Sequence, residues 1–150
     1  MKNILAKIES PLDLKGENDM DKNELIKLVG SLNFPQEEYY ILSSGCLLFY
    51  GLREKANDLD LCISEKLFND IKEKYNLVEE KKNECGFYKL NDLVEVVVDS
   101  PAEFENQYDF KDGYQLQKLE IILRDKKKRN LPKDKRDIEK IERYLSEIER

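Results

Sequence analysis

The stretch from Tyr39 to Ser64 constrains the fold of this chain more than any other. An apolar run leads into the small residues Ser43-Ser44-Gly45, and a second apolar run ends at Gly51-Leu52-Arg53. A short polar loop then leads into Asp58-Leu59-Asp60 and further apolar residues. This pattern predicts strand, helix and strand in succession, over residues 39–43, 45–50 and 59–63.

Asp58 and Asp60 carry the chemical information in this stretch. Side chains at i and i+2 of a strand point to the same face, so the two carboxylates lie side by side. They repel each other unless a cation lies between them, and oxygen ligands of this kind suit Mg²⁺. A small-residue turn at a helix start suits phosphate, because its backbone N–H groups are free to donate. Together these features indicate phosphoryl or nucleotidyl transfer.

This arrangement resembles the minimal nucleotidyltransferase superfamily, in which a Gly-Ser or Gly-Gly turn and a short helix precede an Asp-x-Asp strand. The Gly-Leu-Arg variant looks most like the type IV abortive-infection toxin nucleotidyltransferases (AbiEii-like) and their small stand-alone relatives. Here two serines occupy the turn and Gly45 opens the helix. The resemblance implies that Ser43, Ser44 and Gly45 bind phosphate, with Arg53 as a counter-charge. A structural alternative pairs Arg53 with Glu54 or with an acid near the C-terminus.

The predicted strand over 93–98 supplies candidates for a third acid. Glu95 and Asp99 share one face of that strand and compete for the role that the resemblance implies, which is to complete the metal site or to activate the attacking hydroxyl. Glu95 lies nearer the strand middle and is preferred. The alternative is that one or both acids face solvent on a half-exposed sheet. The expected ligands of one or two Mg²⁺ or Mn²⁺ ions are therefore Asp58, Asp60 and Glu95.

A segment near the C-terminus is strongly basic, although the chain as a whole has a negative net charge. Residues 124–136 contain eight basic and two acidic residues. One interpretation is a solvated helix end, whose cations favour the helix dipole. The other is that some cations reach a triphosphate or an RNA backbone. Residues 133–137 resemble the Lys-x-x-x-Asp motif of the toxin family, which implies that Lys133 contacts phosphate and that Asp137 orients it or braces the helix.

The remaining pattern predicts the rest of an α+β domain. Capping signals open helices after Asp21, Ser64 and Ser100. Apolar spacing extends helices over 21–32, 65–75, 115–129 and 133–150, with a further helical piece around Ile4, Leu5 and Ile8 before Pro11. Residues 77–80 read as an edge strand, and 87–90 with 93–98 as a hairpin. We expect a single domain over 1–150, with a mixed nucleotidyltransferase-like sheet in 1–100 and a helical part in 101–150.

Composition excludes several classes of function. The chain has 150 residues, which is a single-domain length, and a net charge of −6 with a pI near 5.0, which argues against binding nucleic acid over its whole surface. It contains no histidine, so carboxylates, lysines and arginines must perform any catalysis. Its three cysteines have no Cys-x-x-Cys spacing and indicate reduced thiols. With neither a signal peptide nor a membrane span in the pattern, we expect a cytoplasmic protein.

The sequence therefore predicts a Mg²⁺- or Mn²⁺-dependent nucleotidyltransferase that transfers a nucleotide from a nucleoside triphosphate to a hydroxyl of RNA, protein or a small molecule. The resemblance implies a bacterial toxin–antitoxin or phage-defence component, with RNA or an antitoxin-type protein as partner. The alternative is a catalytically inactive protein that keeps the fold for binding or regulation. An antibiotic-modifying nucleotidyltransferase is a third hypothesis.

Overall fold

The computed structural model describes residues 19–148, so the helical piece predicted around Ile4, Leu5 and Ile8 lies outside the described residues. The α-helices are α1 (Lys22–Leu32), α2 (Ser43–Phe49), α3 (Glu65–Ile71), α4 (Pro101–Phe104), α5 (Leu119–Arg129) and α6 (Lys135–Ile148). The strands are β1 (Tyr39–Ile41), β2 (Leu59–Ser64), β3 (Tyr88–Lys89), β4 (Val94–Asp99), β5 (Tyr108–Lys111) and β6 (Tyr114–Gln117). Short 3₁₀ helices are η1 (Gln36–Glu38), η2 (Glu79–Lys81) and η3 (Pro132–Asp134).

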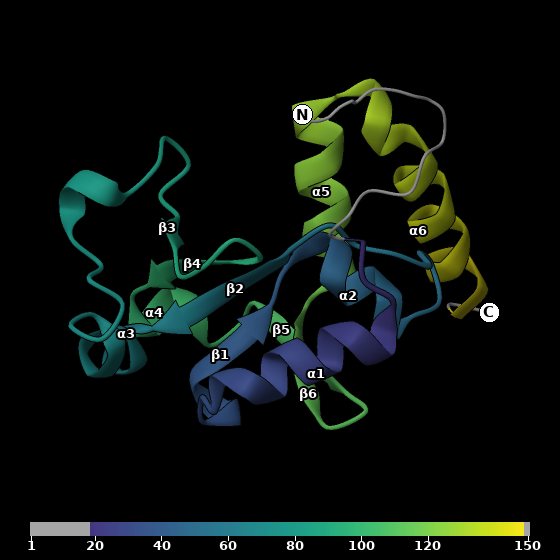
Figure 1. Ribbon diagram of the computed structural model, residues 1–150. Coiled ribbons are helices and arrows are strands. Elements are labelled where there is room, and N and C mark those ends of the chain that lie inside the picture. The colour runs from purple at the N-terminus through teal and green to yellow at the C-terminus, as the bar shows by residue number, and fades with distance from the viewer. Residues whose placement is uncertain (1–18, 149–150) are drawn as a thin grey trace.

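The strands form one mixed sheet at the centre of the molecule (Figure 1). Within residues 19–148 the sheet has six strands in the order β3-β4-β2-β1-β6-β5. The central strand β2 runs antiparallel to β1 and parallel to β4, while β6 runs parallel to β1. Hairpin strands β3 and β5 close the two edges in antiparallel pairing. The predicted α+β class with a mixed sheet is confirmed.

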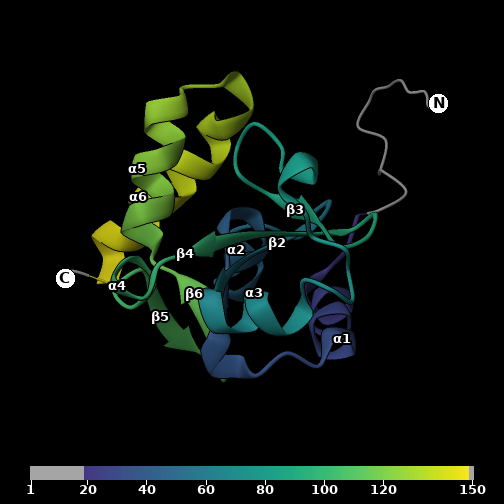
Figure 2. The same ribbon diagram turned by 90° about the vertical axis from the view of Figure 1, so that its left-hand side faces the viewer.

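One face of the sheet is apolar and forms the main core. Alternate residues of β2, Leu59, Leu61 and Ile63, are completely buried on this face. They pack with Leu25 of α1 and Leu67 of α3 in a single apolar cluster. Figures 1 and 2 show α5 and α6 rising beside one end of the sheet, on the side away from α1.

The opposite face is covered at one end and open at the other. Tyr40, Cys62 and Phe104 form a second small apolar cluster, in which the Tyr40 and Phe104 ring centroids lie 5.2 Å apart. This cluster places α4 over one end of β2 and β4. The other end of the same face carries Asp60 and Glu95, which are partners in the parallel register of β2 and β4.

The capping predictions are confirmed. The Asp21 carboxylate accepts a hydrogen bond from the Glu24 N–H at 2.9 Å, and the Glu24 carboxylate accepts one from the Asp21 N–H at 2.9 Å. Ser64 accepts from the N–H of Leu67 at the start of α3. Ser100 caps α4 in the same way, although α4 has only four residues. The predicted hairpin of β3 and β4 is also confirmed.

Several predicted boundaries are wrong. The strand expected over 39–43 ends at Ile41, because Ser43 and Ser44 are the first residues of α2. The expected edge strand at 77–80 is instead the 3₁₀ helix η2 with its preceding turn. Helix α3 ends at Ile71 rather than at residue 75, and α6 begins at Lys135 after η3.

The largest correction concerns residues 108–117, which the sequence placed partly in a helix. They form the β5–β6 hairpin, and β6 pairs with β1 through Ile41 and Leu116. The region 101–150 is therefore not wholly helical, because its first part extends the sheet. The helix predicted from residue 115 begins at Leu119.

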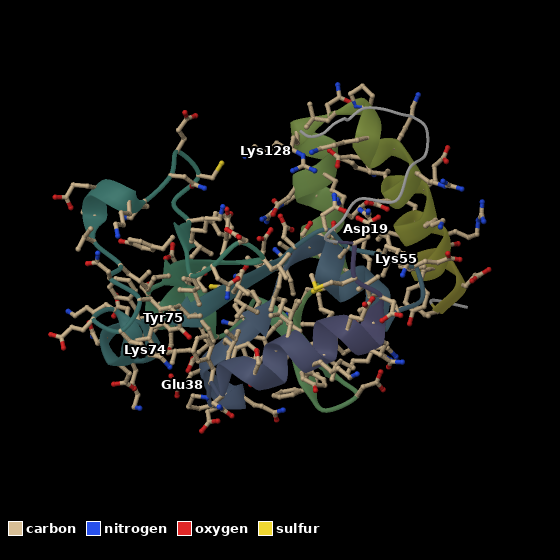
Figure 3. All side chains as sticks on the ribbon, viewed as in Figure 1. Asp19, Glu38, Lys55, Lys74, Tyr75 and Lys128 are labelled. Atoms are coloured by element: carbon tan, nitrogen blue, oxygen red, sulfur yellow. The ribbon has the colours of Figure 1, made fainter. Side chains whose placement is uncertain are left out.

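Many charged side chains are exposed on the outer surface. Lys74 and Lys128 are two exposed examples labelled in Figure 3. No helix within residues 19–148 combines the length and the apolar character that crossing a membrane requires.

Candidate active site

A cavity of about 330 Å³ lies at the open end of the sheet, where β2, α2, α5 and α6 meet. We call it the carboxylate cavity. Its lining residues are Ser43, Ser44, Arg53, Asn57, Asp58, Asp60, Lys126, Arg129, Lys133, Asp134 and Asp137. Seven of the residues that the sequence predicted for the site are thus brought together, although two of them lie more than 70 positions after the others in the chain.

Asp58 and Asp60 form the acidic wall of the carboxylate cavity. Asp58 directly precedes β2 and is exposed, whereas Asp60 lies within β2 and is half-buried. Within the described residues, the Oδ1 atom of Asp60 is buried and has no hydrogen-bond partner. Burial, together with the negative charges of Asp58 and Glu95, raises the pKa of Asp60 to about 7. A cation at this position would relieve both effects.

The strand register separates the two candidates for the third acid. Glu95 is the direct partner of Asp60 in the parallel pair β2–β4. Asp99 lies four residues further along β4, where it pairs with Ser64 and accepts a hydrogen bond from the Tyr40 hydroxyl at 3.4 Å. The structure therefore places Glu95, and not Asp99, beside the aspartate pair. Neither acid is among the described residues that line the carboxylate cavity itself.

The small-residue segment has a different geometry from the one expected. Ser43 adopts a φ of 49°, in the left-handed region that glycine occupies with least strain. Its N–H donates to the Gln117 side-chain oxygen at 3.0 Å. Gly45 is buried within α2, and a Cβ atom there would lie 2.9 Å from Cγ2 of Ile41. Gly45 is therefore needed for close packing of α2 on β1, and it does not line the cavity.

A network of ion pairs forms the opposite, basic wall. The Lys126 ammonium lies 3.5 Å from Asp134 and 3.4 Å from Asp137, and its side chain is only 5% exposed. Arg129 donates to both carboxylate oxygens of Asp134, with one distance of 2.8 Å. Arg53 lies 3.2 Å from Asp137 and donates to the Ser44 hydroxyl at 3.2 Å. These contacts hold α2, α5 and α6 together around the cavity.

This network decides between the two structural partners considered for Arg53. Arg53 pairs with Asp137, an acid near the C-terminus, and not with Glu54. Asp137 also contacts Lys126, so it braces α6 against the rest of the site. Hydrogen bonding from Arg129 lowers the pKa of Asp134 to about 2, with help from the charge of Lys126. Asp134 is therefore ionised throughout the physiological range.

Lys133 occupies the mouth of the cavity. It belongs to η3 and is exposed, and no ion pair involves it among residues 19–148 for which contacts are given. Its ammonium is therefore available to an anion entering the cavity. Four lining residues were not singled out from the sequence: Asn57, Lys126, Arg129 and Asp134. Lys126 could have been found, because it lies one turn after Ile122 on the inward stripe of α5.

The donor chemistry of the acidic wall suits a hard divalent cation, because it offers carboxylate oxygens, one of them buried and unpaired. In residues 19–148, no three Asp, Glu or Cys side chains come together closely enough to hold a metal ion by themselves. Asp58, directly before β2, and Asp60, within it, both line the cavity and are the carboxylates available to such a cation.

Comparison with known proteins provides no relative: no protein-family model, no curated protein and no solved structure matches the chain.

Proposed function

We propose that this protein is a nucleotidyltransferase that uses Mg²⁺ or Mn²⁺ and a nucleoside triphosphate. One observation carries the proposal: Asp58 and Asp60 line the same cavity as four cationic side chains, those of Arg53, Lys126, Arg129 and Lys133. Carboxylates suit the metal, and cations suit the polyphosphate. The parallel pairing of Asp60 with Glu95 supports the third-acid role that the family resemblance implies.

The reaction would join an acceptor hydroxyl oxygen to the α-phosphorus of the triphosphate. The bond from that phosphorus to the β-phosphate oxygen breaks, pyrophosphate leaves, and the hydroxyl proton passes to a base. Lys133 would contact the polyphosphate, and its place in the lining of the cavity, together with Arg129, supports that role. Glu95 is the acid positioned beside Asp60 to accept the proton or to complete the metal site.

The metal would be held by Asp58 and Asp60, with Glu95 as the further candidate. Mg²⁺ is commonly bound by one or two carboxylates together with substrate phosphates. When bound, it would supply Lewis-acid stabilisation of charge at the transferred phosphoryl group.

A second function is favoured by one specific observation. Lys126, Arg53 and Arg129 already contact acids of the protein itself, so part of the positive wall is neutralised internally. A protein that keeps this fold for binding or regulation, without turnover, would need these contacts only for stability. The two functions differ in whether nucleotide is covalently transferred.

Transfer of label from [α-³²P]-nucleoside triphosphates in the presence of Mg²⁺ tests the proposal. The acceptor panel is RNA, protein and aminoglycoside-type small molecules, which covers the toxin and antibiotic-modifying hypotheses, whereas labelling of none of them would favour the binding or regulatory function. Wild type should label one class, and Asp58→Ala and Asp60→Ala should each lower labelling at least a hundredfold. Asp92→Ala, an exposed turn variant, should match wild type. Labelling that survives both site substitutions would overturn the proposal.

The antitoxin-type partner stays a prediction. A protein or RNA that co-purifies with the full chain, and whose release coincides with gain of labelling, would support it.

A further inference from the structure

The strand β5 lies at one edge of the sheet, and its outer side is unpaired among the described residues. It is the last strand in the order β3-β4-β2-β1-β6-β5 and pairs with β6 alone. Figure 2 shows β5 at the margin of the molecule. An unpaired edge presents a row of backbone N–H and C=O groups that can pair with a strand of another chain. The residues of β5 decide which chain fits that edge.

The pairing with β6 determines which backbone groups of β5 point outward. The Lys118 N–H donates to the Gln107 carbonyl at 2.9 Å, directly before the first residue of β5. Hydrogen-bonded and non-hydrogen-bonded positions alternate along an antiparallel pair. The backbone groups of Asp109 and Lys111 therefore bond to β6, whereas those of Phe110 point away from it.

The side chain at the centre of this edge is apolar. Phe110 is 73% exposed, more than any other large apolar side chain in the part of the chain that the structure describes. Its ring centroid lies 5.7 Å from that of Tyr108, which in turn contacts Tyr40 and Phe104. A row of aromatic rings thus leads from the second apolar cluster to the free edge of β5.

Two opposite charges flank Phe110 at equal distance. Asp109 and Lys111 point to the face of the strand opposite to Phe110, because side chains alternate along a strand. Asp109 is exposed, and the Lys111 ammonium lies 5.2 Å from the Tyr50 ring centroid. Like charges on an edge strand repel a second copy of that strand. With one charge of each sign, the segment is instead complementary to itself when its direction is reversed.

We propose that two copies of this chain associate through β5, antiparallel, with Phe110 of one copy directly opposite Phe110 of the other. The outward backbone groups of the two phenylalanines then form a hydrogen-bonded pair. Asp109 of each copy lies opposite Lys111 of the other, which gives two ion pairs on one face, and the aromatic rings meet on the other face. Both copies use the same patch, as two-fold symmetry requires. A shift by one residue would place Asp109 opposite Phe110 and lose both ion pairs.

Sedimentation velocity of the full chain at increasing concentration tests the association. Because the strand is short, we expect a dissociation constant of the order of 10–100 μM. Asp109→Lys and Lys111→Glu should each weaken the dimer at least about tenfold, since each puts two pairs of like charges opposite each other. An equimolar mixture of these two variants should associate as well as wild type does, because every pair in the mixed dimer again joins opposite charges. The double variant Asp109→Lys/Lys111→Glu should also match wild type.

Phe110→Pro tests the backbone pairing. Proline has no N–H to donate, and it is tolerated on an edge strand where that N–H faces outward. The β5–β6 hairpin should therefore persist, with a circular dichroism spectrum like that of wild type, while the protein stays monomeric. Ile148→Ala is the matched control, since it removes another exposed apolar side chain, at the end of α6, and should leave the dimer unchanged.

Three results would overturn the proposal. They are a wild-type chain that is monomeric at every concentration, a dimer that Phe110→Pro does not weaken, and a mixture of the two charge variants that associates no better than either alone. Recovery in the mixture and in the double variant distinguishes charge repulsion from misfolding. The result is independent of the proposed nucleotidyl transfer, because no residue of β5 lines the carboxylate cavity.

Discussion

Asp60 and Asp134 line the same cavity but have opposite electrostatic environments. Asp134 is almost fully buried and contacts Arg129 and Lys126, which keep its carboxylate charged. Asp60 faces two other acids, and one of its oxygens lacks a partner in the described part of the chain. A charge that is partly buried without a counter-ion destabilises the folded state. The ionised carboxylate of Asp60 therefore lowers the stability of the ligand-free protein at the candidate site.

Replacement of Asp60 by Asn should change how stability depends on pH. Because the folded pKa of Asp60 is about 7 and lies above its unfolded value, the folded state binds more protons between about pH 4 and pH 7. Wild type should thus lose stability relative to Asp60→Asn as pH rises through that window. At pH 8 we expect the free energy of unfolding of the variant to exceed that of wild type by about 1–2 kcal/mol, a value that already allows for the partial exposure of the carboxylate.

Urea unfolding at pH 4.5 and pH 8 measures this effect, with Asp92→Asn as the control that should follow wild type. If the free energies of unfolding of Asp60→Asn and wild type differ by the same amount at both pH values, the assigned environment of Asp60 is contradicted.

Among the cations of the basic wall, Lys126 should be the one whose substitution destabilises the protein most. Lys126→Met leaves Asp134 and Asp137 buried with one fewer partner, and removal of one member of a buried pair typically costs 3–5 kcal/mol. We expect about 3 kcal/mol, because each aspartate keeps an arginine. Chemical denaturation of Lys128→Met, an exposed lysine on the same helix, provides the comparison and should agree with wild type within about 0.5 kcal/mol. Equal effects of the two substitutions would refute the network.

At the scale of elements, local signals were sufficient where a helix start has its own chemistry. The capping residues Asp21, Ser64 and Ser100 all make the predicted side-chain hydrogen bonds. The β5–β6 hairpin was missed because its stability is not local. Gln115 and Leu116 are buried by contacts with β1, a strand more than 70 positions earlier, and this burial has no local signal. The turn does have one, because Asp112-Gly113, both with positive φ, is a dipeptide typical of two-residue hairpin turns, and the prediction of a helix from residue 115 did not use it. The apolar spacing placed residues 115–117 at the start of a helix that in the structure begins at Leu119.

The fit of α2 on β1 can be tested at Gly45. A Cβ there would meet the buried Ile41 side chain at 2.9 Å, so Gly45→Ala should destabilise by about 1–3 kcal/mol, through overpacking. Gly30→Ala is the matched control, since Gly30 also lies in a helix but has no atom within 4 Å of the added carbon. It should stabilise by about 0.5–1 kcal/mol through helix propensity. Thermal denaturation giving the same sign for both substitutions would contradict this packing.

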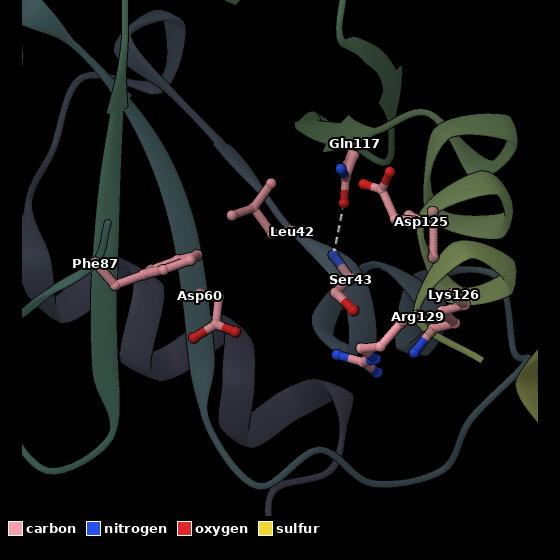
Figure 4. Close-up of a pocket in the computed structure, with 9 residues that line it drawn as sticks. Leu42, Ser43, Asp60, Phe87, Gln117, Asp125, Lys126 and Arg129 are labelled. Atoms are coloured by element: carbon pink, nitrogen blue, oxygen red, sulfur yellow. Dashed lines mark hydrogen bonds between the residues drawn. The ribbon is translucent and has the colours of Figure 1, made fainter. Parts of the chain in front are cut away.

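The candidate site was predicted from sequence where its residues form short motifs. Asp58 and Asp60 follow from strand periodicity, and Arg53, Lys133 and Asp137 from the family resemblance; all five line one cavity. The ion pairs of the basic wall could not be predicted from the sequence, because the partners of Lys126 lie 8 and 11 positions later on separate elements. Gln117 was missed for the same reason, because its contact with the Ser43 N–H joins positions 74 apart in the chain (Figure 4).

At the scale of the whole molecule, the sheet has the apolar core on one face and the candidate site on the other. One face carries the main apolar core, and the open end of the other carries Asp60 and Glu95. Helices α5 and α6 bring basic residues from the last quarter of the chain over acids from its first half (Figures 1 and 2). The net charge of −6 does not extend into this cavity, because its lining carries the four cations Arg53, Lys126, Arg129 and Lys133 against four aspartates.

The most direct test of the central claim is calorimetric titration of the purified full chain with GTP, ATP, CTP and UTP in turn, each in the presence of Mg²⁺. We predict a saturable binding isotherm for wild type, at least tenfold weaker binding without the metal, and a similar loss in Asp60→Asn. Absence of binding by GTP and by the other three nucleoside triphosphates, or an affinity unaffected by both metal removal and Asp60→Asn, would contradict the assignment of this cavity to a metal-bound nucleotide.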